Sequence, residues 1–101
     1  MFEVTNNKGV DITFDNGFTV SVQWGVGNYC DNKWAPGEFG APVSPSRDAE
    51  IAAFTPGGHF VHLSNGDDVY GYVSANKVLA FMNAVAAMTP EQTRLDVSFL
   101  D

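Results

Sequence analysis

The side chains best suited to covalent chemistry in this chain are one cysteine, Cys30, and two histidines, His59 and His62. A cysteine acts as a nucleophile only when a neighbouring base keeps part of it in the thiolate form. The sequence around Cys30, NYCDN, has none of the signatures of catalytic cysteines, and the negative charge of Asp31 beside it opposes thiolate formation. We therefore expect Cys30 to be a packed or surface loop residue and not a nucleophile.

The same histidines are poor candidates for a metal site. They lie three residues apart in an expected strand, so their side chains point to opposite faces and cannot hold one ion together. Asp67 and Asp68 can join His62 only if the tertiary structure happens to bring them there. No pair of acidic residues has a spacing that singles it out for acid/base catalysis. We expect no catalytic residue, no metal site and no cofactor, and a small hydrolase is the least favoured alternative.

The most unusual part of the sequence is the segment from Gly25 to Arg47, GVGNYCDNKWAPGEFGAPVSPSR. It contains four of the ten glycines and three of the five prolines, and neither a strand nor a helix period persists in it. Loops longer than about 12–15 residues are usually functional or disordered. Disordered segments contain few aromatic residues, whereas this one contains three. We predict an ordered surface loop that carries the binding site.

Polar side chains flank the aromatic rings in and beside this loop. Aromatic faces next to amide and arginine groups suit stacking on a nucleobase or contact with a protein partner. A phosphate would need one of the few basic side chains. The alternative is that the aromatic rings, including Phe39, form only the loop's own small core. The candidate ligand-binding residues are Trp24, Asn28, Tyr29, Asp31, Asn32, Lys33, Trp34 and Arg47.

Length, charge and cysteine content restrict the class of protein. The 101 residues suit a single domain, residues 1–101, with one hydrophobic core. The net charge of −7 argues against direct nucleic-acid binding, which depends on clustered Lys and Arg. One cysteine leaves no internal disulfide and fits a reducing compartment. Without a secretory signal or an apolar run long enough to cross a bilayer, we expect a cytoplasmic protein with no membrane partner.

Two strands precede the long loop and are expected to form a hairpin. Residues 10–14 and 18–24 alternate apolar and polar side chains, with β-branched and aromatic residues enriched. A three-residue loop, Asp15-Asn16-Gly17, puts all the apolar side chains on one face, whereas a two-residue turn separates them. In this register Phe14 faces Phe18, Ile12 faces Val20, Val10 faces Val22, and Gly17 takes the left-handed position.

Further strands are expected after the loop. A second hairpin runs from Glu50 to Leu63 around the turn Thr55-Pro56-Gly57-Gly58, with apolar side chains on both faces. In this hairpin Phe54 faces Phe60. A short strand follows at residues 69–73, and residues 2–5 form an additional edge strand.

One helix is predicted, with Ser74 as its N-cap and its end at Met88. The spacing of Thr89, Pro90 and Gln92 then predicts a short helical turn, and the tail from Leu95 alternates weakly, like an edge strand. Together these elements predict an α+β fold, an antiparallel sheet of about five strands with one C-terminal helix packed on one face. The apolar stripe expected to face the sheet consists of Val78, Phe81, Met82 and Val85.

Two segments, NGFTVSVQWGVGNYCDN (residues 16–32) and VYGYVSANKVLAFMNAVA (residues 69–86), resemble small proteins of unknown function encoded by tailed bacteriophages. They cover about a third of the chain. The resemblance implies an accessory factor that blunts host defences, either by covering a defence protein or by sequestering a nucleotide signal. It brings no catalytic residues with it.

The function expected at this point is therefore binding without catalysis. The protein is interpreted as a phage-type antagonist of bacterial immunity in the host cytoplasm, with the 25–47 loop as its recognition element. Its partner is expected to be a small nucleotide ligand or a host defence protein, and these alternatives stay open. A phage structural or interaction protein is the next alternative. A homo-oligomer is a further expectation, because a second copy would pair or cover the open edges of the sheet.

Overall fold

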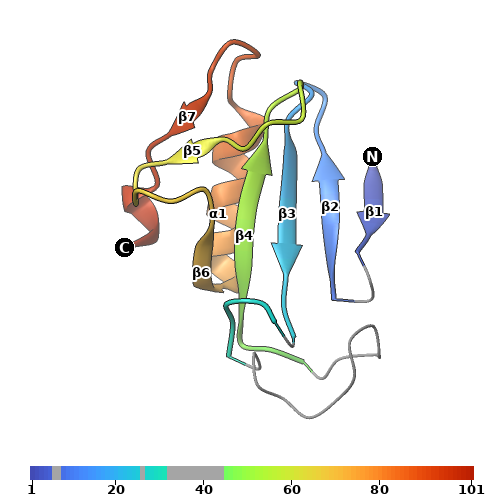
Figure 1. Ribbon diagram of the computed structural model, residues 1–101, viewed down its shortest axis with the longest axis vertical. Helices are drawn as coiled ribbons and strands as arrows, with labels where there is room; N and C mark the ends of the chain where they lie inside the picture. Colours follow the sequence, from blue (N-terminus) through green and yellow to red (C-terminus); the bar gives the residue numbers. More distant parts are fainter. Residues whose placement is uncertain (6–7, 26, 32–44) are drawn as a thin grey trace.

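The computed structural model describes residues 1–5, 8–25, 27–31 and 45–101. Its main element is a five-stranded antiparallel sheet in the order β1-β2-β3-β4-β6, with helix α1 against one face (Figure 1). The predicted α+β class is confirmed. The elements are β1 (Phe2–Val4), β2 (Gly9–Thr13), β3 (Thr19–Gln23), β4 (Asp48–Phe54), β5 (His62–Leu63), β6 (Tyr70–Ser74), α1 (Ala75–Ala86), β7 (Arg94–Leu95) and a 3-10 turn at Ser98–Leu100.

The β2–β3 hairpin has the predicted register. Ile12 pairs with Val20 and Val10 pairs with Val22. The Phe14 amide donates to the Phe18 carbonyl at 2.9 Å, and Gly17 has a φ of 88°. This register is selected because it alone puts the apolar side chains of both strands on the sheet face against which α1 packs.

The second hairpin is only partly as predicted. The turn forms, since the Thr55 amide donates to the His59 carbonyl at 2.7 Å and Phe54 bridges to Phe60. The chain then leaves the sheet, and β6 takes the place beside β4. Strand β5 pairs instead with β7, in parallel. The alternation in residues 60–63 predicts which side chains are buried but not which strand lies beside them. Any neighbouring strand that covers Val61 and Leu63 is compatible with the same pattern.

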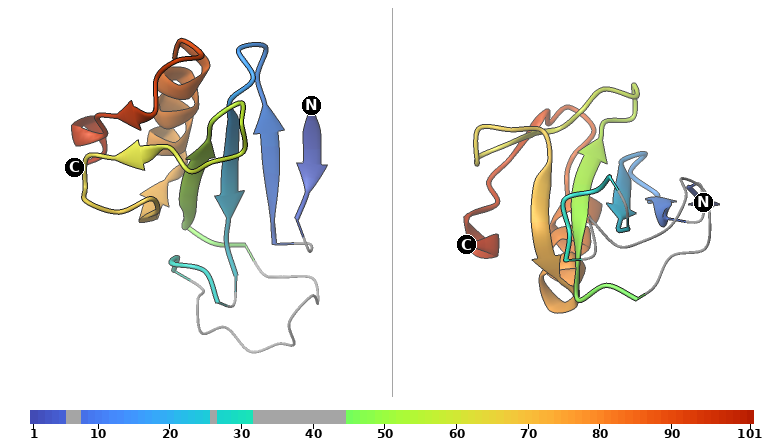
Figure 2. Two further views of the ribbon diagram at one scale, coloured as in Figure 1. Left: turned by 45° about the horizontal axis from the view of Figure 1, so that its top comes forward. Right: turned by 60° about the horizontal axis from the view of Figure 1, so that its bottom comes forward.

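Helix α1 covers β3, β4 and β6, as Figure 2 shows from two further sides. Ser74 is its N-cap as predicted, although its side chain makes no capping hydrogen bond. Phe81 and Val85 are fully buried against the sheet, and Val78 and Met82 pack at the margin of the core. Over the described part of the chain, no helix is long and apolar enough to cross a membrane.

The C-terminal segment is partly as predicted. Thr89 to Gln92 form the expected single turn, in which Gln92 Oε1 accepts from the Thr89 amide at 2.7 Å and the Gln92 amide donates to the Thr89 carbonyl at 3.0 Å. The predicted tail strand shortens to β7, and Val97 and Leu100 then turn into the core. After the turn, Leu95 pairs with Leu63 of β5.

Candidate functional site

A cavity of about 360 Å³ lies where the end of β3, the start of β4 and the first turn of α1 meet. Its apolar walls come from the core sides of these elements. Its rim comes from the residues that lead into β4. We call it the Trp24–Arg47 cavity and define it by Val22, Trp24, Arg47, Ala49, Val73 and Val78.

Two of the predicted ligand-binding residues, Trp24 and Arg47, meet at this cavity although 23 positions separate them in the sequence. Trp24 is half-buried and its amide donates to the Lys8 carbonyl at 2.8 Å. The Arg47 side chain is 90% exposed, and its Nε lies 4.0 Å from Oδ2 of Asp31. An exposed ion pair of this kind is worth little, so the guanidinium remains available to a ligand.

Three more predicted residues, Asn28, Tyr29 and Asp31, lie beside the cavity and do not line it. The Asn28 side chain donates to the Trp24 carbonyl at 2.9 Å, so it braces the loop. The Tyr29 amide donates to Glu50 Oε2 at 2.7 Å. The predicted residues Asn32, Lys33 and Trp34 lie outside the described residues.

The backbone of residues 27–31 is held against the sheet at two strands. The amide of Asp31 donates to a carboxylate oxygen of Asp48 in β4, and the amide of Tyr72 in β6 donates to the Tyr29 carbonyl at 2.9 Å. This close approach needs Gly71, because a Cβ there would lie 2.7 Å from Cβ of Tyr29. The described part of the predicted loop is thus built onto the sheet.

The first turn of α1 borders the cavity through Ala75. Amide groups at the start of a helix have no partner within the helix and carry a partial positive charge. Ser74 supplies no side-chain cap, and the first turn contains no acidic residue. The helix start therefore borders the cavity without a side-chain cap on its amide groups.

Ser46 is a cavity residue that the sequence analysis missed. Its Oγ is buried and has no hydrogen-bond partner within the part of the chain that the structure covers. Buried polar atoms without partners are rare, and each one needs an explanation such as water or a ligand. No sequence signal marks this serine, because SPSR reads as an ordinary loop and its burial depends on the tertiary fold.

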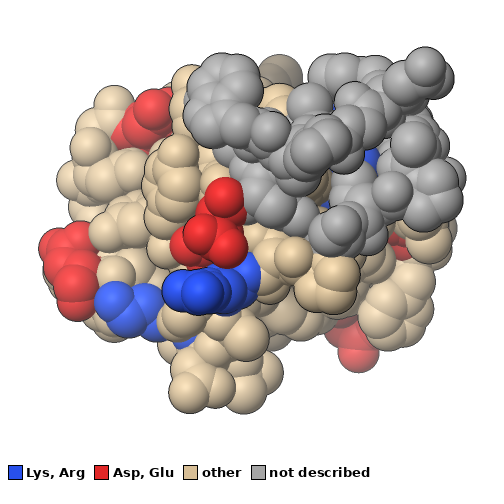
Figure 3. Space-filling model, turned by 90° about the horizontal axis from the view of Figure 1, so that it is seen from below, with Lys and Arg blue, Asp and Glu red and all other residues tan. Residues whose placement is uncertain are grey.

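The charges at this end of the molecule are mixed. Asp48 also lines the cavity, so one carboxylate faces the same space as Arg47. Figure 3 shows acidic and basic side chains touching on this face, and not a patch of one sign. Such a surface does not attract polyanions broadly, so selectivity must come from groups placed around the cavity.

The residues with possible covalent chemistry lie elsewhere or are already engaged. Cys30 is buried, and its sulfur lies 3.2 Å from the Gly25 amide. Of the two expected placements, packed or at the surface of the loop, Cys30 has the packed one. His59 is exposed, while Nδ1 of His62 pairs with Oδ1 of Asp68 at 2.9 Å. Within residues 1–5, 8–25, 27–31 and 45–101, no three His, Cys, Asp or Glu side chains are placed to hold a metal ion.

The geometry thus provides one cavity with an indole, a guanidinium, a helix start and a buried hydroxyl. It can hold a flat ring with an anionic group. Comparisons with models of protein families, with curated proteins and with solved structures gave no match for this chain. The likeness to phage proteins therefore stays a prediction from the sequence.

Proposed function

We propose that this protein acts by binding and not by catalysis, and that the Trp24–Arg47 cavity holds a small ligand of the nucleotide class. The observation that carries the proposal is the meeting of Trp24 and Arg47 at one cavity. An indole stacks on a planar ring, and a guanidinium forms paired hydrogen bonds to phosphate. A planar base and a phosphate are the two halves of a nucleotide.

The size and walls of the cavity agree with such a ligand. Its volume of about 360 Å³ lies within the range of about 300–1,000 Å³ for small-molecule sites. Val22, Ala49, Val73 and Val78 provide the apolar surface on which a base is bound away from water. The remaining polar groups are few, which is also typical of sites that bind and orient one ligand.

Two features favour an anionic group at the rim. The Arg47 guanidinium is exposed and only loosely paired, and the start of α1 has no side-chain cap. Helix starts bind phosphate because their free amides and dipole face the anion. Asp48 opposes an anion placed next to it, so the phosphate is expected on the Arg47 side.

Under this proposal the protein sequesters a nucleotide signal. That mode is the one that the resemblance to phage proteins implies for an antagonist of bacterial immunity. The alternative partner, a host defence protein, would use the same exposed end of the molecule. Exposed charge complementarity would then make binding weaker at higher salt.

The test is isothermal titration calorimetry with a panel of linear and cyclic nucleotides, after native mass spectrometry has ranked them. Arg47→Ala should weaken binding of the best nucleotide by about tenfold or more, as expected for loss of a charge-assisted hydrogen bond. Arg94→Ala, the same change at an exposed position in β7, is the matched control and should leave affinity unchanged. Binding of no nucleotide, or equal loss in both variants, would contradict the proposal.

A further inference from the structure

Strand β1 is one edge of the five-stranded sheet, and within the described residues no strand pairs with its outer side (Figure 1). At the opposite edge, the amide of Tyr72 in β6 donates to the Tyr29 carbonyl, so another segment of the chain meets that edge. Open edges pair readily with a further strand, and proteins usually protect them with charges, proline or a bulge. The edge of β1 is therefore the place where a strand can be added.

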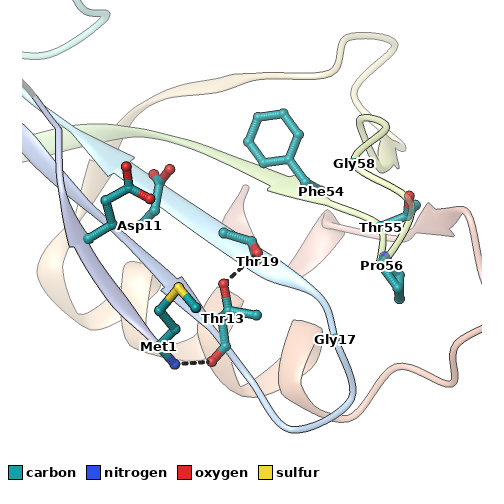
Figure 4. A pocket seen from close by; sticks show the side chains of 10 residues that line it. Met1, Asp11, Thr13, Gly17, Thr19, Phe54, Thr55, Pro56 and Gly58 are labelled. Atoms are coloured by element: carbon teal, nitrogen blue, oxygen red, sulfur yellow. Dashed lines mark hydrogen bonds between the residues drawn. The ribbon is translucent and has the colours of Figure 1, made fainter.

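The backbone of β1 points outward at two residues. The ammonium group of Met1 donates to the Thr13 carbonyl at 2.8 Å, as Figure 4 shows, and the Thr13 amide donates back to the Met1 carbonyl at 2.8 Å. The Thr5 amide donates to the first carbonyl of β2 at 3.0 Å. Alternate residues of an antiparallel strand bond to the same neighbour. The N–H and C=O groups of Phe2 and Val4 therefore point away from β2.

The side chains of Phe2 and Val4 are unusually exposed for apolar residues, at 78% and 71%. They pair with Ile12 and Val10 of β2, and Val10 pairs in turn with the buried Val22. Paired residues of neighbouring strands share a face, so Phe2 and Val4 lie on the face against which α1 packs. Since α1 covers β3, β4 and β6, an apolar surface continues past the helix to the open edge.

A second copy of this chain presents the same edge, and a two-fold axis joins two such strands antiparallel. The outward residues allow few registers. If Phe2 lies opposite Val4 of the partner subunit, the Glu3 carboxylates of the two copies oppose each other, which is unfavourable. If Val4 lies opposite Val4 of the partner subunit, Glu3 lies opposite the uncharged Thr5 of the partner subunit. If Phe2 lies opposite Phe2 of the partner subunit, Glu3 lies opposite Met1 of the partner subunit and within reach of its ammonium group.

The charges beside the edge favour the last of these registers. Met1, Glu3 and Asp11 line one cavity of about 470 Å³ on the sheet face that α1 does not cover (Figure 4). Glu3 already lies opposite Asp11 of β2. A neighbouring strand that brings a positive group next to Glu3 is therefore favoured over one that brings a third carboxylate.

We propose that this protein forms a two-fold symmetric dimer in which the β1 strands of two copies pair antiparallel, with Phe2 opposite Phe2 of the partner subunit. The two residues exchange backbone hydrogen bonds, and their rings form a cross-strand aromatic pair. Val4 packs diagonally against the partner's Phe2. The two sheets then join into one.

The contact is small, below about 1,200 Å², so the dimer is expected to exchange with monomers and to depend on protein concentration. The proposal does not rest on nucleotide binding, because no residue of β1 lines the Trp24–Arg47 cavity. Failure of one proposal therefore leaves the other intact.

Sedimentation velocity over a range of protein concentrations, without nucleotide, should show monomers and dimers in exchange. Phe2→Pro removes the outward amide and the ring but no hydrogen bond to β2, and edge strands accept proline at such positions. It should weaken the dimer by about tenfold or more, since the central hydrogen bonds and the aromatic pair are lost. Val4→Pro makes the same change at an outward amide that has no partner in this register, so it should weaken the dimer much less. Circular dichroism checks that both variants keep the fold.

Disulfide trapping identifies the register. Cys30 is buried, so a cysteine introduced into β1 is the accessible thiol. In the proposed register, Phe2→Cys puts the Cα atoms of the two cysteines about 5.5 Å apart, and oxidation should link the dimer covalently. Glu3→Cys puts them about 7–8 Å apart, beyond the usual range of a disulfide, and should link poorly.

The charge of Glu3 separates the registers by the sign of its effect. Glu3→Gln should weaken the dimer, because the attraction to the ammonium group of the partner's Met1 is lost. Asp11→Asn is the matched control, since it removes a carboxylate from the same face one strand further from the partner, and its effect should be smaller. A protein that stays monomeric up to about 1 mM, equal weakening by the two proline variants, faster linking of Glu3→Cys than of Phe2→Cys, or a stronger dimer in Glu3→Gln would overturn the proposal.

Discussion

The side-chain amide of Asn16 donates a hydrogen bond of 2.9 Å to the carbonyl oxygen of Val85, 69 residues away in the sequence. The same Nδ2 lies 3.2 Å from the Ala86 carbonyl and 2.9 Å from that of Met88. Oδ1 of Asn16 accepts from the Phe18 amide at 3.1 Å. One residue thus shapes the β2–β3 turn and also donates to carbonyl groups at the end of α1 and just beyond it.

Replacing Asn16 tests how much this link stabilises the fold. Asn16→Ala should lower the free energy of unfolding by about 1–2 kcal/mol, because several carbonyl groups lose a donor. Asn16→Asp should lower it further, since a carboxylate there meets the negative end of the helix dipole. Urea denaturation followed by circular dichroism measures both.

Asn76→Ala provides the matched control for that experiment. Asn76 is exposed in the first turn of α1, so its replacement should leave stability unchanged or slightly higher, given the better helix propensity of alanine. If Asn16→Ala were as neutral as Asn76→Ala, the hydrogen bonds to Val85 and Met88 would not be a significant source of stability.

Gly71 controls how closely the segment of residues 27–31 approaches β6. Gly71→Ala should displace this segment, because the added Cβ would lie 2.7 Å from Cβ of Tyr29. The expected cost is about 1–3 kcal/mol, as for other overpacking changes. Hydrogen exchange at Tyr72, whose amide donates to Tyr29, should become faster.

Gly57→Ala is the control for this change, since its added Cβ would meet its nearest neighbour at an ordinary 3.5 Å. Its exchange rates near Tyr72 should match those of the original protein. Unchanged exchange in Gly71→Ala would mean that the contact between Tyr29 and β6 does not hold the segment.

Asp96 should make stability depend on pH. Its pKa is lowered by hydrogen bonds from the Ser98 backbone and side chain and from the Ser64 hydroxyl. A pKa that is lower in the folded state gives stability above the unfolded pKa of about 3.9, and this stability is lost as the pH falls through the folded value. Asp96→Asn should therefore destabilise the protein at neutral pH, and its difference from the original protein should shrink in acid.

Thermal unfolding at a series of pH values measures the effect of Asp96→Asn. Asp15→Asn, at an exposed turn residue, is the control for loss of one negative charge. A difference that is constant with pH in Asp96→Asn would show that the hydrogen bonds of Asp96 do not favour its ionised form.

Two apolar residues of α1 should respond differently to truncation. Phe81 is fully buried, so Phe81→Ala should cost about 3–5 kcal/mol and unfold much of the protein at room temperature. Leu79 is 59% exposed on the same helix, and Leu79→Ala should change stability by less than about 0.5 kcal/mol. Equal effects of the two changes would contradict the packing of α1 on the sheet.

Local sequence patterns were sufficient to predict those elements whose structure depends on residues close together in the sequence. The register of the β2–β3 hairpin followed from the choice between two turn lengths, because only one keeps Ile12 and Val20 on the buried face. The helix start at Ser74 and the stripe through Phe81 and Val85 followed from the 3.6-residue period. These features depend on short-range sterics and on which side chains avoid water.

The sequence by itself therefore determined the fold class, the turns and the candidate pair Trp24 and Arg47, but not their surroundings. Only the tertiary structure decided that β6 lies beside β4, that Asn16 caps α1, and that Ser46 and Asp11 line cavities. The physical reason is that alternation and periodicity record whether a side chain is buried, and they carry no information about its partner. Partners distant in the sequence are chosen by packing of the whole chain, where many weak contacts are satisfied together.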